Sequence, residues 1–359
     1  MNQRPPSHAP IGFGIVGLGM IADFHAQAIA GVPGAKLIGT CGRSPEKTQA
    51  FATKHHAPFA TTDLGELLAR PDIHAICITT PSGAHLEPAL AAARAGKHIV
   101  IEKPIEITLP RVDELLRATR AAGVKVMPIF QARFGDGART VKAAHAAGRF
   151  GRLTLASAYV KWQRTAEYYR DSWHGTRALD GGGALINQAI HAIDLLQWFA
   201  GLPEEVFSWN TRRVHTGIEV EDTAVATLRF PGGALGTIEA TTAAYPGWAR
   251  RIELCGENGS ACLEDDRIVR WDFREARPED AAILSARADE TMRSGAGAPN
   301  AISHYGHQRQ IQNLVDAINL NSPLEVDGPE ARKAVALILA LYESAQKGAS
   351  VKLPSSPSS

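Results

Sequence analysis

The chain has 359 residues, of which 45% are hydrophobic and 21% charged, and this composition excludes the disordered, collagen-like and coiled-coil classes. At roughly 150 residues per domain, the length predicts about two domains. The 38 Lys and Arg residues nearly balance the 37 Asp and Glu residues, so a net charge of +1 gives no field to hold a polyanion or an acidic membrane. Neither nucleic acid nor a membrane is therefore expected as a partner.

The four cysteines are scattered, without a CxxC pair or a nearby pair of histidines. This spacing favours neither a disulfide scaffold nor a structural zinc site, and no metal is expected. The first ten residues are polar and proline-rich, unlike a signal peptide, and no run approaches the roughly 18 apolar residues of a membrane span. We expect a soluble, cytoplasmic protein.

From Ile11 to Pro128, short β-rich runs alternate with alanine-rich helical runs. This alternation is typical of a parallel sheet built from βαβ units, so residues 1–130 are predicted to form a doubly wound Rossmann α/β domain that binds a dinucleotide. The predicted strands are Phe13–Val16, Lys36–Cys41, Ala75–Thr79, His98–Glu102 and Lys125–Met127, and the predicted helices are Ile21–Ala30, Leu64–Ala69, Pro88–Ala95 and Arg111–Ala121.

After about residue 130 the pattern changes to longer helices and successive strands joined by tight turns. Residues 131–359 are therefore predicted to form an α+β domain with a large, mainly antiparallel open sheet that binds substrate and mediates oligomerisation. Residues from Arg274 to Pro299 are expected to form an exposed loop. The predicted helices are Thr140–Ala147, Ala184–Ala200, Gln308–Asn319 and Pro329–Gln346, and the predicted strands are Leu153–Trp162, Phe207–Val214, Thr223–Phe230, Ala234–Thr242, Arg251–Cys255 and Ser260–Glu264.

The apolar residues of these strands predict self-association. Val225, Leu228, Leu235 and Ile238 are examples, and helices on one face of a sheet would not cover all of them. We expect a homo-oligomer, a dimer or a tetramer, that uses the exposed face of this sheet.

A glycine pattern follows the first predicted strand: residues 17–22 read Gly-Leu-Gly-Met-Ile-Ala and fit G-x-G-x-x-A at the start of a helix. Gly17 permits the tight turn, Gly19 lets backbone N–H groups approach a pyrophosphate, and the helix N-terminus favours its negative charge. A second match that begins at Gly12 lies inside the strand, where no helix could follow.

The end of the second predicted strand bears on the choice of cofactor. An NAD site expects an acidic residue there, to bond the ribose 2′-hydroxyl. This chain has Arg43 and Ser44 instead, which suit the 2′-phosphate of NADP. The alternative is a solvated Arg43 and a Ser44 that caps the next helix. The sequence favours NADP over NAD.

Two further features carry candidate chemistry. Lys103 follows the carboxyl end of a parallel strand, where open α/β sheets bind ligands, although such a lysine can also be a surface residue paired with Glu102. On the predicted helix after Gly181–Gly183, three polar residues fall within an arc of about 60° on an otherwise apolar helix. These residues, Asn187, His191 and Asp194, must face either a polar cleft or a closed internal network in which Asp194 holds His191.

Together these segments resemble the glucose–fructose oxidoreductase/inositol dehydrogenase/rhizopine-catabolism (Gfo/Idh/MocA) family of NAD(P)-dependent sugar oxidoreductases, over nearly the whole chain. The segments that carry the resemblance are Val16-Gly17-Leu18-Gly19, the turn from Thr80 to His85, Ala95-Gly96-Lys97-His98 with Glu102-Lys103-Pro104, the triple-glycine helix with His191, and Leu341-Tyr342-Glu343-Ser344-Ala345. The resemblance implies hydride transfer between the nicotinamide and a hydroxyl-bearing carbon of a sugar, sugar derivative or cyclitol.

The resemblance also implies roles for individual residues. Lys103 and His191 are the expected catalytic residues, and the bond before Pro104 is expected to be cis. Many members carry an aspartate where this chain has Asn187, and an amide cannot take a proton, so His191 is the expected base. The expected cofactor-binding residues are Gly17, Gly19, Met20, Ile21, Arg43, Ser44, Thr80, Pro81, Ser82, His85, Glu102 and Lys103; the expected substrate-binding residues are Lys103, Arg164, Tyr168, Trp173, Asn187 and His191.

Within the family, residues 164–169 and 173–176 resemble members that act on hexoses, inositols or nucleotide-linked sugars such as UDP-N-acetylglucosamine-derived acids. Two other functions remain open. The fold also serves NAD-dependent glycosidases, which oxidise a sugar only transiently, and a regulator could use it to sense a cofactor or sugar without turnover. Release of reduced cofactor separates a dehydrogenase from both.

Overall fold

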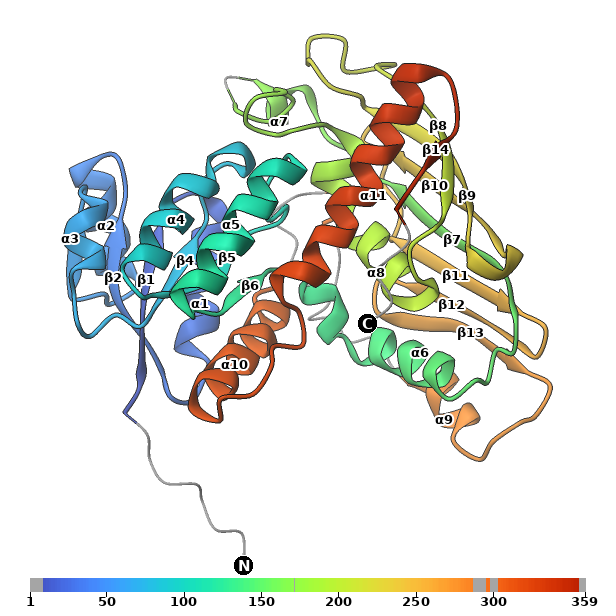
Figure 1. Cartoon of the computed structure of the whole chain (residues 1–359), viewed down its shortest axis with the longest axis horizontal. Helices are drawn as coiled ribbons and strands as arrows, with labels where there is room; N and C mark the ends of the chain where they lie inside the picture. The colour runs from blue at the N-terminus through green and yellow to red at the C-terminus, as the bar shows by residue number, and fades with distance from the viewer. Residues whose placement is uncertain (1–8, 171, 287–294, 298–302, 355–359) are drawn as a thin grey trace, which may run out of the picture. The chain divides into compact units, whose positions relative to one another are not determined.

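The computed structural model describes residues 9–170, 172–286, 295–297 and 303–354 (Figure 1). The chain divides into two compact units. The first contains the chain up to Glu106 together with Pro110–Gln131 and His304–Pro329; the second contains Ile107–Leu109, Ala132–Ser303 and the chain from Glu330. None of the described helices is long and apolar enough to cross a membrane.

The first unit is the predicted Rossmann sheet, with six parallel strands in the order β3-β2-β1-β4-β5-β6. The strands are β1 (Ile11–Val16), β2 (Ala35–Cys41), β3 (Phe59–Thr61), β4 (Ala75–Ile78), β5 (His98–Ile101) and β6 (Val126–Pro128). The helices are α1 (Met20–Ala30), α2 (Pro45–Lys54), α3 (Leu64–Leu68), η1 (Ser82–Ala84), α4 (Leu86–Arg94), α5 (Leu109–Ala122) and α10 (Tyr305–Asn319).

Strand β1 lies at the centre of this sheet, between β2 and β4, where the winding of the chain reverses. Ligands of open α/β sheets bind at the carboxyl ends of strands at such a point. All six residues of β1 are buried, and a Cβ on Gly12 would lie 1.8 Å from the backbone oxygen of Asp72. The early glycines of this strand therefore allow close packing inside the sheet. The glycine pattern that begins at Gly12 lies within the strand and does not start a helix, as predicted.

Helix α10 belongs to the first unit, although the sequence analysis assigned it to the second domain. It packs on α1, and Ile311, Leu314 and Val315 join the buried cluster formed by α1 and one face of the sheet. The pairing joins segments almost 300 positions apart in the sequence. The apolar spacing of α10 predicts that it is a helix, but contains no information about which sheet it covers.

The second unit contains an eight-stranded sheet in the order β13-β12-β11-β7-β10-β9-β8-β14, in which the described pairs are antiparallel except β7 with β10. The strands are β7 (Leu153–Lys161), β8 (Glu205–Thr211), β9 (Thr223–Arg229), β10 (Leu235–Thr241), β11 (Arg251–Gly256), β12 (Gly259–Glu264), β13 (Arg267–Phe273) and β14 (Val351–Lys352). The helices are η2 (Gln131–Phe134), α6 (Asp136–Ala146), α7 (Ala166–Tyr169), η3 (Ala184–Gln188), α8 (Ile190–Ala200), η4 (Pro231–Gly233), α9 (Asp280–Ser285) and α11 (Gly328–Lys347).

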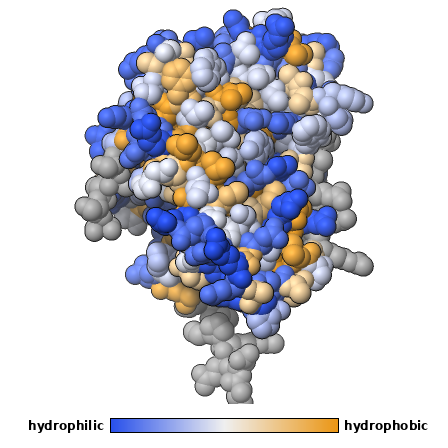
Figure 2. Space-filling view, turned by 90° about the vertical axis from the view of Figure 1, so that its right-hand side faces the viewer, coloured by the Kyte–Doolittle hydropathy of each residue, from blue (hydrophilic) through white to orange (hydrophobic). Residues whose placement is uncertain are grey.

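One face of this sheet is covered by helices, among them α8 and α11 (Figure 1). Alternate residues of β9 and β10 point to this face, so Leu228 and Ile238, two of the four apolar residues singled out in the sequence, are buried in the core. Val225 and Leu235 do lie on the outer face, where they are 43% and 52% exposed. Figure 2 shows this side of the molecule, with apolar side chains gathered among hydrophilic ones.

The structure differs from the predicted elements at several places. The predicted helix Ala184–Ala200 is a π-helical turn, η3, followed by α8. Helix α2 was expected only as the helix that Ser44 would cap, and the strands β3 and β13 were not predicted, because their sequences are short or polar. In the region expected to be an exposed loop, α9 occupies Asp280–Ser285; residues 287–294 and 298–302 lie outside the described residues.

Candidate active site

The glycine turn after β1 has the geometry that a dinucleotide requires. Gly17 has a φ of +89°, and a Cβ there would lie 2.8 Å from the backbone nitrogen of Thr80. Gly19 begins α1 without a side-chain cap, and a Cβ on it would meet no atom within 4 Å. The first N–H groups of α1, at Met20 and Ile21, therefore lack a side-chain cap, which fits a pyrophosphate group.

After β2, Ser44 caps the next helix, which is the alternative that the sequence left open for this residue. Its hydroxyl accepts a hydrogen bond from the Lys47 N–H at 3.4 Å and donates one to Glu46 at 2.9 Å, so it caps α2. Arg43 is exposed. Whether these two residues bind a 2′-phosphate stays a prediction.

The turn after β4 is held to the turn after β5 by His85, which is 1% exposed. Its two ring nitrogens lie 2.9 Å from the backbone oxygens of Thr80 and Pro104. Burial lowers the pKa of His85. That Thr80, Pro81, Ser82 and His85 contact the cofactor stays a prediction. What the structure shows is that His85 fixes the backbone beside Lys103.

Lys103 follows β5 and precedes a cis peptide bond to Pro104, as the resemblance implied. The preceding residue, Glu102, is buried, so it is not the surface partner of a lysine. One of its oxygens lies 2.8 Å from His25 Nε2 and 3.3 Å from His307 Nε2, and the other accepts a hydrogen bond from the Lys103 N–H at 3.1 Å. The carboxylate thereby ties the backbone of Lys103 to α1 and α10.

The charge state of this cluster follows from its contacts. Burial alone would raise the pKa of Glu102, but the hydrogen bonds and charges of His25 and His307 hold it well below its ordinary value. Burial lowers the pKa of His25. Carboxylate and imidazole groups also bind zinc. Here, however, both imidazoles lie at hydrogen-bond distance from the same oxygen, so the arrangement is a hydrogen-bonded network around an ionised Glu102.

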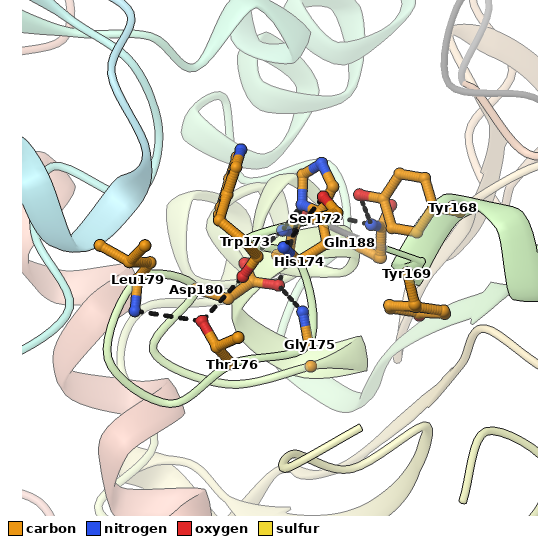
Figure 3. A network of polar contacts seen from close by, with 12 residues as sticks. Tyr168, Tyr169, Ser172, Trp173, His174, Gly175, Thr176, Leu179, Asp180 and Gln188 are labelled. Atoms are coloured by element: carbon orange, nitrogen blue, oxygen red, sulfur yellow. Dashed lines mark hydrogen bonds and ion pairs between the residues drawn. The ribbon is translucent and has the colours of Figure 1, made fainter. Parts of the chain in front are cut away.

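In the second unit, the predicted substrate residues Tyr168 and Asn187 lie in one polar network. Figure 3 shows this network with Tyr168, His174, Asp180 and Gln188. Gln188 Nε2 donates to the Tyr168 hydroxyl and to the Asn187 side-chain oxygen, at 3.1 Å each. Asn187 Nδ2 donates to Asp180, and the His174 ring stacks on Tyr168 with 4.3 Å between centroids. Burial raises the pKa of Tyr168 well above its ordinary value, so the hydroxyl is protonated.

Arg164 completes this network and has an unusual environment. It is 5% exposed and donates to the backbone oxygens of Gln163 and Ala296 and, at 2.7 Å, to Gln188 Oε1. Its Nε is buried with no hydrogen-bond partner, and no carboxylate among the described residues pairs with the guanidinium. Burial lowers the pKa of Arg164. The guanidinium is thus buried beside Trp162 and Tyr168, and within the described part of the chain it has no anionic partner.

Trp173 lies in the same segment, with its ring centroid 3.9 Å from that of His174. His174 is held further by Asp180, whose carboxylate also accepts from the Gly175 N–H at 2.8 Å (Figure 3). Asp180, His174 and Gln188 were not among the predicted site residues. Two features of the sequence could have indicated two of them. Asp180 stands directly before the three glycines, and His174 lies within residues 173–176, which resemble other members of the family.

His191 and Asp194 lie on α8 and are both buried. One of the two alternatives predicted from the sequence was that Asp194 holds the ring of His191. In the structure, both oxygens of Asp194 accept hydrogen bonds from Arg133, at 2.7 Å each, so its main partner is this arginine. The three polar residues therefore divide: Asn187 belongs to the network of Tyr168 and Gln188, and Asp194 belongs to a buried ion pair with Arg133.

Comparison with known proteins identifies the family. Residues 11–130 match the model described as an oxidoreductase family with an NAD-binding Rossmann fold, and residues 138–262 match the GFO/IDH/MocA C-terminal domain. The chain belongs to the Gfo/Idh/MocA family. The resemblance and the fold class predicted from the sequence are therefore confirmed, and the protein is an oxidoreductase whose relatives are NAD(P)-dependent sugar and inositol dehydrogenases and reductases.

Three relatives place the chain within the family. It is 34% identical to the WlbA dehydrogenase from Bordetella pertussis, solved in complex with NADH and UDP-GlcNAcA, with a TM-score of 0.89 over 98% of this chain and 100% of that one. It is 32% identical to the WlbA dehydrogenase from Chromobacterium violaceum, solved with the same two ligands, with a TM-score of 0.86 over 99% of each chain. It is also 26% identical to myo-inositol 2-dehydrogenase from Thermotoga maritima, over 95% of this chain and 98% of that one.

Proposed function

We propose that this protein is an NAD(P)-dependent dehydrogenase that oxidises a hydroxyl-bearing carbon of a sugar acid, with nucleotide-linked uronic acids as the favoured class. The observation that carries this proposal is the buried Arg164, which has no carboxylate partner among the described residues. Buried charges are ordinarily paired, and a guanidinium matches a carboxylate through two parallel hydrogen bonds. A substrate carboxylate would supply the missing partner.

The similarity to the two WlbA dehydrogenases supports this substrate class, because both were solved with UDP-GlcNAcA. In the same network, Tyr168, Asn187 and Gln188 present hydroxyl and amide groups of the kind that bond sugar hydroxyls. Trp173 offers an aromatic ring to the sugar. A neutral cyclitol would leave Arg164 without its counter-charge.

For the chemical step, the nicotinamide supplies the hydride acceptor, and the protein supplies binding, orientation and proton transfer. The N–H groups at the start of α1 would hold the pyrophosphate. His191 is the proposed base, because an imidazole titrates near neutral pH and Asn187 cannot take a proton. Lys103, whose backbone is fixed by Glu102, is proposed to hold the reacting hydroxyl and to relay its proton.

The observations that bear on the choice between NAD and NADP point in different directions. Both WlbA dehydrogenases were solved with NADH, and Ser44 is engaged as a helix cap. Arg43 is exposed where NAD enzymes carry an acidic residue, which favours NADP. We therefore still predict that the protein binds NADP more tightly than NAD.

The substrate class is tested with a matched pair, UDP-GlcNAcA and UDP-GlcNAc, which differ at the carboxylate. We expect the wild type to prefer the acid in kcat/KM by at least about 100-fold, since charged hydrogen bonds are worth several kcal/mol. Arg164→Gln should remove most of that preference. Equal kcat/KM for the two sugars, or a preference that Arg164→Gln leaves unchanged, would refute the assignment.

The residue roles are tested separately. A general base contributes about 10²- to 10⁴-fold, so His191→Ala and Lys103→Ala should each lower kcat by about that factor while leaving the Kd for the cofactor nearly unchanged. Asn187→Ala should mainly raise KM. Near wild-type turnover by His191→Ala, with circular dichroism showing an intact fold, would mean that the histidine is structural.

A further inference from the structure

Two side chains remote in the sequence, Glu221 and Tyr342, bond the backbone of the turn that precedes α8. Glu221 lies just before β9 and Tyr342 lies on α11, both within the second unit. Four consecutive N–H groups of the turn donate to them. Gly183 N–H and Leu185 N–H donate to the two carboxylate oxygens of Glu221, at 3.0 Å and 2.9 Å, and Ala184 N–H donates to the Glu221 backbone oxygen at 3.1 Å. Ile186 N–H donates to the Tyr342 hydroxyl at 3.3 Å.

These bonds supply acceptors for the N–H groups at the start of a helix. The first four N–H groups have no partner inside the helix, and buried donors need one. Here the helix start is the π-helical turn η3, whose residues Ala184–Gln188 are all buried. The first bond within the turn's own backbone is from Asn187 N–H to the Gly183 oxygen, at 3.0 Å. Glu221 and Tyr342 therefore serve all four of the N–H groups before it.

The glycines before the turn fit this arrangement. A Cβ on Gly182 would lie 2.1 Å from the Tyr342 hydroxyl oxygen, and a Cβ on Gly183 would lie 1.8 Å from the Glu221 backbone oxygen. Glycine is therefore required at both positions for the two remote groups to approach the backbone. The Tyr342 hydroxyl also donates to Glu221 Oε1 at 2.8 Å, which joins the two groups into one unit.

The turn carries part of the proposed substrate network. Asn187 and Gln188 are at its end, and Gln188 bonds both Tyr168 and Arg164. The segment of Glu221 reaches Arg164 by a second route, because the Asp222 backbone oxygen accepts from Thr242 N–H and the Thr242 backbone oxygen accepts from Arg164 N–H, at 2.8 Å each. One short segment thus fixes both the turn and the strand end that hold the buried guanidinium.

We propose that Glu221 and Tyr342 are positioning residues for the substrate: they set the register of the π-helical turn and so place Asn187 and Gln188 against the sugar. Neither residue would contact the substrate itself. This inference rests on the proposed function, because it gives the network around Arg164 the role of substrate site. It also assigns a role to Tyr342 in the closing segment Leu341–Ala345, which the chemical step does not use.

The test compares Glu221→Gln and Tyr342→Phe with a matched control, Asp266→Asn. Asp266 is a buried carboxylate in the same unit that also bonds a helix start, accepting from Gly137 N–H at 3.2 Å and Ala138 N–H at 3.0 Å. Helix α6, which it holds, carries none of the proposed site residues. Each variant is measured for kcat and KM with the sugar that the wild type oxidises, for the cofactor Kd, and for Tm.

We expect Glu221→Gln and Tyr342→Phe to lower kcat/KM by about 10- to 100-fold, as a misplacement of about 1 Å can do, with the cofactor Kd within twofold of wild type. Asp266→Asn should keep kcat and KM within twofold even where it loses as much Tm. Wild-type kinetics in Tyr342→Phe, or activity that falls with Tm alike in all three variants, would overturn the proposal.

The comparison of these variants tests the positioning role even if one variant does not fold or the proposed substrate class is wrong. If Glu221→Gln does not fold, Tyr342→Phe removes one hydroxyl and leaves the carboxylate in place, so it carries the test alone. Because the variants are compared on whichever sugar the wild type oxidises, a failed preference for sugar acids would refute the substrate class without altering the ratio between Tyr342→Phe and Asp266→Asn.

Discussion

Replacing Glu102 by glutamine tests the buried network behind Lys103. The ionised carboxylate accepts three hydrogen bonds, from His25, His307 and the Lys103 N–H. Glutamine offers one neutral oxygen, so at least one buried donor must face its NH₂ group. Hydrogen bonds to a charged group contribute about 1.5–3 kcal/mol, and an orphaned donor costs about 1–3 kcal/mol. We expect Glu102→Gln to lower the free energy of unfolding of the first unit by about 3 kcal/mol at neutral pH.

The pH dependence has a definite sign. The folded pKa of Glu102 lies below its unfolded value of about 4.3, so the unfolded chain binds more protons, and the stability from Glu102 is complete above about pH 4.3 and lost as pH falls through the folded pKa. The pKa of His25 is also lowered, from about 6.5. The unfolded chain therefore binds a proton more readily at this histidine, and stability decreases further as pH falls below about 6.5. The stability that the Glu102 carboxylate itself contributes, and that Glu102→Gln removes, should therefore be complete at neutral pH and shrink as pH falls below about 4.3.

The assay must report on the first unit. All six tryptophans lie in the second unit, so their fluorescence is a control, and native-state hydrogen exchange of peptides from β5 and α10 gives the opening free energy. Asp72→Asn, which removes an exposed carboxylate paired with Arg70, should leave exchange unchanged. Exchange in Glu102→Gln within about 0.5 kcal/mol of wild type would refute the reasoning, because surface substitutions alone reach that value.

Three further predictions concern the cofactor, the assembly and the core. Arg43→Ala should weaken NADP about tenfold and leave NAD unchanged in calorimetric titration, since one charged contact is lost; unchanged NADP binding would exclude a role for the arginine. Light scattering should show a dimer or tetramer that Trp209→Lys, on the outer face of the second sheet, converts to monomer, while Leu320→Lys does not; a monomeric wild type would contradict this. Asp194→Asn should cost about 3 kcal/mol in urea unfolding followed by tryptophan fluorescence, because Arg133 is 3% exposed and loses its main counter-charge; an unshifted midpoint would show that Glu330 suffices.

Much of the fold was predictable because it depends on local patterns. The order of strands and helices, the glycine turn at Gly17 and the position of Lys103 after a strand all follow from short segments read in sequence. Pairings between distant segments were not predictable. Glu102 bonds residues 77 and 205 positions away, and Arg133 reaches Asp194 across 61 positions. Neither hydrophobic period nor composition contains information about such contacts.

The candidate site shows a second limit. A regular rotation of 100° per residue grouped Asn187 with Asp194 and placed Gln188 elsewhere. The π-helical turn changes the rotation per residue, so Asn187 and Gln188 share one network, and Asp194 lies in another. The turn depends on Glu221 and Tyr342, which lie 36 and 156 positions from the amides they bond, at Leu185 and Ile186. The irregular backbone that builds the site therefore depends on contacts absent from the local sequence.

The measurement that tests the central claim most directly is the amount of reduced cofactor formed for each sugar acid consumed. Enzyme and UDP-GlcNAcA are mixed in comparable amounts with oxidised cofactor, so that reduced cofactor that stays bound is also counted by absorbance, and the sugar product is separated by chromatography. A dehydrogenase predicts one molecule of reduced cofactor for each molecule of sugar oxidised. Cleavage of a glycosidic bond without reduced cofactor would identify a glycosidase of this fold, and binding of sugar and cofactor without any product would identify a sensor; either result would contradict the account.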